Sequence, residues 1–239
     1  MSVIISFDFL ASSKLYVLVE FKGKLYISKM ELKVVNNSVH AKNLGYDMID
    51  LTKGDGNYTP ENIYSYNIQD DTKIHIDAPK VLDSKLYFAK DTGEIIQFDV
   101  NTKEEKVLDK VSDQNNMVLV GITLFLNKET KKLYYFGVVD NKYEIIEYDL
   151  NTDSKKVIAQ DSKKYYSVFQ LTNEGLYFLK ISNGDSYSVE LHEYVFSEEK
   201  DKLITGEPVN NIIIKDIQEI ILETIQVWIT NLLIHIEDQ

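Results

Sequence analysis

The sequence predicts an all-β fold built from repeated four-stranded sheets, and three observations lead to this prediction. Two stretches, residues 85–108 and 132–158, share the same blocks of residues in the same order. Aromatic and β-branched residues gather in short apolar runs, as half-buried strands require. Turn-forming residues separate these runs, so the chain reverses after each one. Each copy is therefore expected to be an antiparallel unit of short strands.

The two best copies contain the same three strand blocks. They read KLYFAKDTGEIIQFDVNTKEEKVL and KLYYFGVVDNKYEIIEYDLNTDSKKVI. Each begins with Lys-Leu-Tyr and an aromatic residue, continues with Glu-Ile-Ile, and closes with Lys-Val and an aliphatic residue. Asp91-Thr92-Gly93 and Asp140-Asn141 supply residues that tolerate positive φ between the first two blocks. Apolar runs at 118–126 and 165–171 precede copies and add a fourth strand to the unit.

Weaker copies surround this pair, at residues 14–35, 46–77 and 175–204. The leucine of the Leu-Tyr pair stands at positions 15, 86, 133 and 176. Units of four short strands that recur every ~40–50 residues are typical of β-propeller blades. A unit that cannot cover its own apolar faces must stack against its neighbours. We therefore expect about five blades in residues 1–206, or six if the C-terminal residues complete another.

The repeat resembles the blades of the broad β-propeller class, which includes kelch-like, quinoprotein-like and YVTN-like repeats. The residues that carry the resemblance are Leu86-Tyr87-Phe88 with Phe98-Asp99-Val100-Asn101-Thr102, and Leu133-Tyr134-Tyr135 with Tyr148-Asp149-Leu150-Asn151-Thr152. The sequence lacks the Trp-Asp pair of WD40 repeats and the paired glycines of kelch blades. The resemblance implies an architecture, and it transfers no activity because propellers host many unrelated functions.

The C-terminal segment, residues 207–239, breaks the repeat. Its apolar residues recur at helical spacing, and the segment contains no glycine. This period favours an amphipathic helix, whereas its many β-branched residues favour strands that would form a further blade. As a helix it would cover the propeller, or it would contact a partner or a second copy of the chain. The candidate contact residues are Trp228, Ile221, Ile225 and Leu232.

Composition excludes several classes of function. The net charge is -12, and all 26 basic residues are lysines, so the bidentate fork of arginine is unavailable for reading bases or clamping phosphates. We therefore expect no nucleic-acid partner. No apolar run is long enough to span a bilayer, and the N-terminus has no signal-peptide pattern, so we expect a cytoplasmic chain without a membrane partner. The absence of cysteine excludes disulfides and thiolate chemistry.

The sequence contains no recognisable catalytic motif, and we expect no catalytic, cofactor-binding or metal-binding residues. Its histidines, at positions 40, 75, 192 and 235, are far apart. The loop around Asp55 lacks the spaced oxygen ligands of an EF-hand and is expected to be a turn. Asp99 and Asp149 occupy equivalent places in two copies, so we interpret them as turn caps rather than as a catalytic carboxylate pair.

These observations favour a non-catalytic scaffold that binds a protein or a small ligand through its loops and the mouth of its channel. Two alternatives stay open. One is a propeller hydrolase or lyase that acts on carbohydrates or lactones with channel carboxylates, with or without Ca²⁺. The other is an assembly subunit that forms homo-oligomers through its C-terminal segment.

Overall fold

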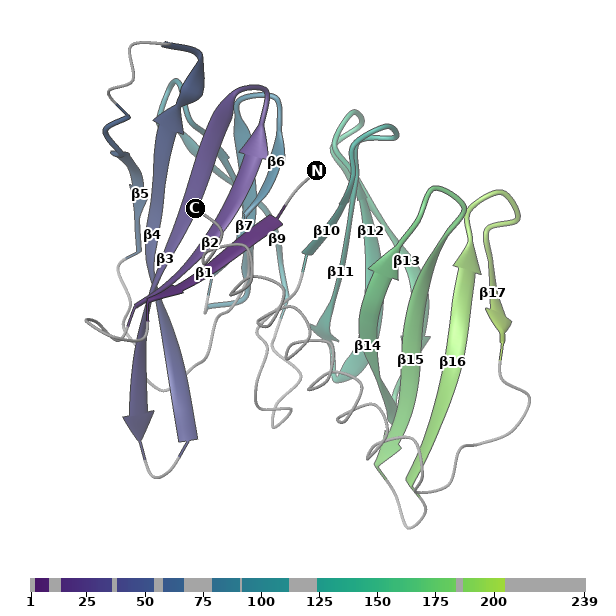
Figure 1. The fold of residues 1–239 in the computed structure, drawn as a ribbon. Coiled ribbons are helices and arrows are strands. Elements are labelled where there is room, and N and C mark those ends of the chain that lie inside the picture. Colours follow the sequence, from purple (N-terminus) through teal and green to yellow (C-terminus); the bar gives the residue numbers. More distant parts are fainter. Residues whose placement is uncertain are drawn as a thin grey trace, which may run out of the picture. The chain divides into compact units, whose positions relative to one another are not determined.

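The computed structural model describes residues 3–8, 14–35, 38–53, 58–66, 79–90, 92–111, 124–183 and 187–204. The chain divides into two compact units. The first contains strands β1 to β13, and the second contains the sheet of β14 to β17. Figure 1 labels most of the strands.

Four antiparallel sheets make up the described residues, and each follows the order of the chain. Sheet A contains β1 (Val3–Asp8), β2 (Lys14–Phe21), β3 (Lys24–Val35), β4 (Ser38–Asp50) and β5 (Glu61–Ser65), with the short 3-10 helix η1 (Leu51–Lys53) after β4. Sheet B contains β6 (Lys80–Leu82), β7 (Lys85–Ala89), β8 (Glu94–Asp99) and β9 (Glu105–Lys110). Sheet C contains β10 (Leu124–Asn127), β11 (Lys132–Val139), β12 (Lys142–Asp149) and β13 (Ser154–Asp161). Sheet D contains β14 (Lys164–Leu171), β15 (Gly175–Asn183), β16 (Tyr187–Val195) and β17 (Lys200–Leu203).

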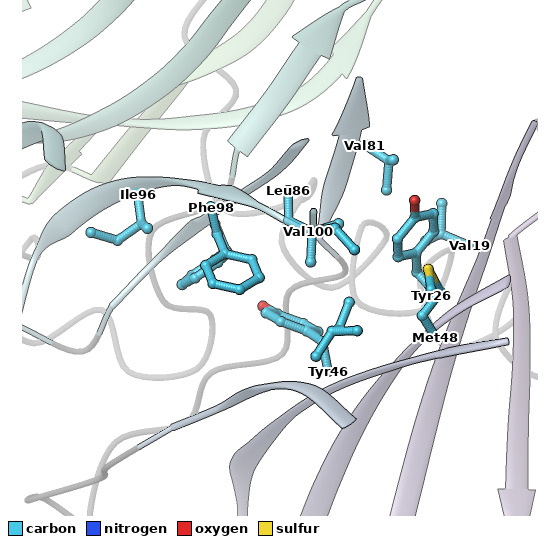
Figure 2. Packing of buried hydrophobic residues seen from close by; sticks show 11 residues of the cluster. Val19, Tyr26, Tyr46, Met48, Val81, Leu86, Ile96, Phe98 and Val100 are labelled. Carbon is cyan, nitrogen blue, oxygen red and sulfur yellow. The ribbon is translucent and has the colours of Figure 1, made fainter. Parts of the chain in front are cut away.

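Sheets A, B and C pack face to face in the first unit. One apolar cluster joins sheets A and B, and Figure 2 shows Tyr26 and Tyr46 of sheet A facing Leu86 and Phe98 of sheet B. A second cluster joins sheets B and C. Successive four-stranded antiparallel sheets packed in this way are the blades of a propeller. The predicted all-β class with blade-like units is therefore confirmed.

Packing on both faces explains why the strand blocks are continuously apolar. Side chains alternate between the two faces of a strand. In β7, Leu86 and Phe88 belong to the cluster shared with sheet A, whereas Tyr87 and Ala89 belong to the cluster shared with sheet C. A sheet covered on one face alone would alternate apolar and polar residues. The Leu-Tyr-aromatic block is thus the pattern of an interior blade.

Turn residues reverse the chain where the sequence predicts it. Gly93, between β7 and β8, has a φ of 86°, and the equivalent turn of sheet C places Asp140 and Asn141 at 49° and 61°. Asparagine, aspartate and glycine adopt this left-handed region at the smallest cost. These hairpins close the second and third strands of their sheets.

The structure corrects the division of residues 14–77 into two repeats. Residues 14–35 and the strands that follow them lie in one five-stranded sheet, so four sheets occupy the described part of residues 1–204. The equivalent of Leu86 is Leu25 on β3, and not Leu15 on β2. Lys24 pairs with Asp50 in the register in which Lys85 pairs with Asp99 and Lys132 with Asp149. β1 is an additional strand that precedes the unit.

A backbone hydrogen bond at the same position in all four sheets supports this alignment of the repeats. The residue before each Lys-Leu-Tyr, or before Gly-Leu-Tyr in sheet D, accepts a hydrogen bond from the amide that follows the third strand of the unit. The N···O distances are 2.8 Å for Leu51 to Gly23, 2.9 Å for Val100 to Ser84, 3.0 Å for Leu150 to Lys131 and 2.9 Å for Phe196 to Glu174. The first and third turns of each unit therefore lie side by side.

Candidate functional site

The partner-contact residues predicted from the sequence lie outside the described residues. These residues are Trp228, Ile221, Ile225 and Leu232, and the choice between helix and strand for 207–239 lies outside them too. Asp55 of the glycine-rich loop, with His75 and His235, is also beyond the described ranges. The expectations for these positions stay predictions.

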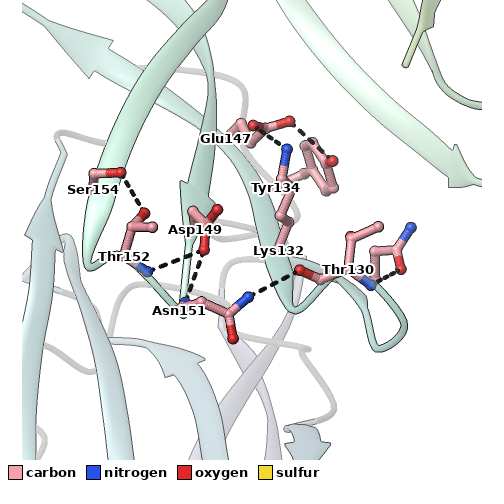
Figure 3. A network of polar contacts seen from close by, with 9 residues as sticks. Thr130, Lys132, Tyr134, Glu147, Asp149, Asn151, Thr152 and Ser154 are labelled. Carbon is pink, nitrogen blue, oxygen red and sulfur yellow. Dashed lines mark hydrogen bonds and ion pairs between the residues drawn. The ribbon is translucent and has the colours of Figure 1, made fainter. Parts of the chain in front are cut away.

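Asp99 and Asp149 cap turns, as the repeat predicts. Asp149 Oδ1 accepts hydrogen bonds from the backbone amides of Asn151 at 2.8 Å and Thr152 at 3.2 Å, which Figure 3 shows at the end of β12. Asp99 Oδ1 accepts the equivalent bonds at the same two distances. The amide hydrogen bond from Asn151 is the main cause of the lowered pKa of Asp149. These carboxylates therefore serve the hairpins.

The strongest candidate site is the end of the first unit where the first turns of sheets A, B and C meet. We call it the turn end, and it consists of Glu20, Phe21, Lys22, Asp83 and Lys128. Lys22 Nζ lies 2.9 Å from Asp83 Oδ1 and so joins sheet A to sheet B. Lys128 Nζ, from the turn between β10 and β11, lies 4.1 Å from the centroid of the Phe21 ring and joins sheet C to sheet A.

Phe21 holds two ammonium groups. The ring packs against the apolar cluster of sheets A and B, and Lys22 Nζ lies 5.1 Å from its centroid. The face of an aromatic ring carries partial negative charge and attracts cations within about 6 Å. Phe21 is the last residue of β2 and lies on the same face of the strand as the fully buried Val19, so the strand fixes the position of the ring at this turn.

Lys128 is a partly buried cation. Burial lowers the pKa of its ammonium group, Glu20 acts in the opposite direction, and Lys22 lowers it further. Glu20 Oε1 also accepts a hydrogen bond from the Gly23 amide at 3.0 Å, which directs this carboxylate at the backbone of its own turn. Within the part of the chain that the structure describes, Lys128 has no ion pair. The ring of Phe21, at 4.1 Å, also compensates its charge.

A second polar cluster lies in sheet D, where it replaces part of the repeated core. His192 occupies the position of Ile96 and Ile146, both fully buried. Its Nδ1 lies 2.7 Å from Asp201 Oδ1, and its Nε2 lies 3.3 Å from Glu190 Oε2. Its ring stacks on Phe178 with centroids 5.3 Å apart.

The polar cluster of sheet D connects charged side chains from several strands of this sheet. Lys164 Nζ donates a hydrogen bond of 2.7 Å to Glu190, so β14, β16 and β17 all contribute charged groups. The hydrogen bond from Lys164 lowers the pKa of Glu190, and the contact with His192 adds to this effect. Both imidazole nitrogens face carboxylates within sheet D.

The described residues contain neither a metal-binding cluster nor a membrane-spanning helix. Among the residues that the structure describes, no three histidine, aspartate or glutamate side chains gather closely enough to hold a metal ion. In the same residues, no helix has the length and apolar character needed to cross a membrane.

The sequence did not identify the turn end. Phe21 and Lys128 belong to none of the repeated blocks that carry the resemblance. Their approach depends on how sheets A and C come together, and the spacing of residues along the chain does not contain that information. A partial signal was available in the aromatic residue immediately before the Lys-Gly turn.

Comparison with known proteins identifies no family. No family model and no curated protein matches the chain. Among solved structures, an oligogalacturonate lyase in complex with manganese has 11% identity and a TM-score of 0.37, covering 87% of this chain and 74% of that one. A structure titled nidogen/laminin complex has 11% identity and a TM-score of 0.37, covering 82% and 93%. A putative 6-phosphogluconolactonase from Bacteroides uniformis has 8% identity and a TM-score of 0.43, covering 86% and 70%.

Proposed function

We propose that the chain is a non-catalytic scaffold that binds a protein or a small ligand at the turn end. The observation that carries this proposal is the meeting of three turns from separate sheets around Phe21, with the partly buried ammonium of Lys128 above the ring. Loops positioned by a rigid framework are the usual place for recognition. The proposal keeps the expectations of a cytoplasmic chain without nucleic-acid or membrane partners.

The hydrogen-bond partners of the other polar side chains support binding rather than catalysis. Asp99 and Asp149 cap hairpins, and the imidazole of His192 is held between Asp201 and Glu190. General acid–base catalysis needs a group within hydrogen-bond reach of the substrate. These side chains already make their hydrogen bonds to other groups of the protein. The lysines of the turn end are placed to attract a ligand, and no nucleophile–base pair accompanies them in the described residues.

The outer strands are poorly suited to binding by strand addition. β9, β13 and β17 end their sheets, and each carries exposed lysines, such as Lys106, Lys156 and Lys202. Charged side chains on an edge strand, lysine above all, discourage pairing with another strand. This makes the turn end the better candidate for contact with a partner.

Ligand screening followed by mapping of protected amides tests the proposal. The full chain is screened against peptides and small metabolites, and each ligand that binds is followed by amide hydrogen exchange. We expect protection of residues 20–24, 83–85 and 128–131, with the ligand recovered chemically unchanged. Conversion of a carbohydrate or lactone would instead establish the hydrolase or lyase alternative. Protection confined to the outer strands or to residues 207–239 would contradict binding at the turn end.

A further inference from the structure

The charge balance of the turn end indicates which chemical group it binds. Lys22 and Lys128 approach the same phenyl ring from different sheets, so their positive charges repel each other. Asp83 compensates Lys22 directly, at 2.9 Å. Glu20 lies close enough to influence Lys128, but one of its oxygens accepts the Gly23 amide. Among the residues that the structure describes, no carboxylate forms an ion pair with the ammonium of Lys128.

A cation in this position gains from a ligand anion more than an exposed lysine does. Removing an ammonium group from water is costly unless an opposite charge or hydrogen-bond acceptors replace the lost solvation. Phe21 supplies part of that compensation through its ring face. An oxygen anion near Nζ of Lys128 would supply the remainder, and it would also reduce the repulsion between Lys128 and Lys22.

The neighbouring carboxylates limit the charge of the ligand group. Lys22 is already paired with Asp83, so among the described residues Lys128 is the one ammonium group of the turn end without a direct ion pair, and Glu20 offsets part of its charge. Glu20 and Asp83 would repel a second negative charge brought to the same place. A phosphoryl dianion usually binds several donors, with arginine favoured, and the chain contains no arginine. A monoanionic carboxylate fits this balance better.

We propose that Lys128, assisted by Lys22, binds a carboxylate group of the ligand at the turn end. The inference rests on the proposed function and specifies the chemistry of that same site. Phe21 keeps the ammonium of Lys128 in place, and Lys22 contributes a second, weaker attraction because it is shared with Asp83. The bound group makes no covalent bond with the protein.

Titration of the full chain with sodium acetate tests this inference. The backbone amide signals of Gly23, Ser84 and Thr130 are followed by NMR, with sodium chloride at equal ionic strength as the reference salt. We expect saturable shifts with acetate and only the general ionic response with chloride. Lys128→Gln should abolish the saturable shifts, Lys128→Arg should retain them, and Lys22→Gln should weaken acetate binding several-fold.

Lys110→Gln is the matched control, because Lys110 is an exposed lysine of β9 that lies 4.0 Å from Glu94. This variant should bind acetate as the unmodified chain does. Equal responses to acetate and chloride, or saturable shifts that persist in Lys128→Gln, would overturn the inference. Tighter binding of inorganic phosphate than of acetate would overturn the assignment to carboxylates.

The two proposals fail in different ways. If a peptide or metabolite protects the turn-end amides but acetate does not bind, the carboxylate inference is wrong and the binding scaffold stands. If acetate binds through Lys128 but all larger ligands protect other surfaces, the proposed function is wrong and the anion site stands.

Discussion

The hydroxyl of Tyr134 on β11 donates a hydrogen bond of 3.0 Å to the carboxylate of Glu147 on β12 (Figure 3). The two residues are directly opposite each other in the sheet. Tyr177 makes the same bond to Glu193 at 2.8 Å in sheet D. In sheet B the partner of Tyr87 is the neutral Gln97, at 3.4 Å. The ring of this tyrosine is buried in sheets B and C and half-buried in sheet D, and in all three sheets its hydroxyl bonds to the residue opposite it on the neighbouring strand.

We expect Tyr134→Phe to lower the free energy of unfolding by about 1–2 kcal/mol, because the lost bond has a charged acceptor. Glu147 would keep its ion pair with Lys132, at 2.8 Å. Tyr87→Phe is the matched control, and its longer bond to a neutral acceptor should make the loss about half as large. Urea denaturation measures both variants. Equal losses would show that the charge of Glu147 contributes nothing.

The cap at the end of β12 gives a second prediction. Asp149→Ala removes the acceptor of two backbone amides and should destabilise the chain by about 1 kcal/mol. Asp149→Asn keeps an acceptor oxygen and should lose less than half of that amount. Thermal and urea unfolding of both variants are the measurements. An Asp149→Ala variant as stable as the unmodified chain would contradict the role of this side chain in the hairpin.

The contact between sheets B and C contains one buried and one exposed carboxylate. Asp109 accepts a hydrogen bond of 2.8 Å from the hydroxyl of the fully buried Tyr135, and it pairs with Lys155 at 2.7 Å. Asp109→Ala leaves that hydroxyl without this acceptor, so we expect a loss of about 2–4 kcal/mol. Urea denaturation provides the value.

The exposed ion pair between Lys106 and Asp153 is the control for the contact of Asp109. It also links the two sheets, at 2.6 Å, but both side chains are half exposed to solvent. Because Asp153 also accepts a hydrogen bond from the hydroxyl of the buried Tyr148, the control variant is Lys106→Ala, which removes the ion pair alone. Solvent and salt weaken such surface pairs, so Lys106→Ala should change stability much less than Asp109→Ala. The reverse ranking would refute the importance of burial at this contact.

Glu190 should give sheet D a dependence on acid pH. Its pKa is lowered, chiefly by the hydrogen bond from Lys164. A carboxyl group whose pKa is lower in the folded state stabilises the fold above its unfolded pKa, and this contribution disappears as the pH falls through the folded pKa. We therefore expect the stability difference between the unmodified chain and Glu190→Gln to be largest near neutral pH and to shrink below pH ~4.

Glu198→Gln is the control for this measurement, since Glu198 also pairs with a lysine, Lys202, but on the surface of the turn before β17. The hydrogen bond from Lys202 lowers the pKa of Glu198 as well, but both side chains are about half exposed, so solvent screens this pair. Glu198→Gln should therefore change the pH dependence of stability less than Glu190→Gln does. A Glu190→Gln variant with an equally small effect at every pH would contradict the stabilising role of the Lys164 contact.

Sequence alone predicted the repeated unit but placed its first copy incorrectly. Lys-Leu-Tyr occurs twice near the N-terminus, at residues 14–16 and 24–26, on the neighbouring strands β2 and β3. Both copies suit a strand, so composition could not decide between them. β3 and β4 are 12 and 13 residues long, and this length separates Lys24 from the capping Asp50 further than in the other units. The length of this hairpin made the spacing that sheet A shares with the other sheets difficult to recognise in the sequence.

Local chemistry was more predictable than the site. The roles of Asp99 and Asp149 follow from side chains and backbone amides two or three residues apart, which spacing reveals directly. The contact between Phe21 and Lys128 joins residues from sheets A and C and depends on the packing of three sheets. Similarly, His192 appeared isolated in the sequence because Asp201 reaches it only after strand pairing aligns β16 with β17.

Hydrogen exchange at four backbone amides tests most directly whether the four sheets share one alignment of the repeat. The amides of Leu51, Val100, Leu150 and Phe196 each donate to the residue before Lys-Leu-Tyr or its equivalent. Native-state exchange measured by NMR should find all four strongly protected. Rapid exchange at Leu51, with slow exchange at Val100 and Leu150, would contradict this account. It would show that sheet A does not share the repeated unit and that its turn does not lie at the proposed site.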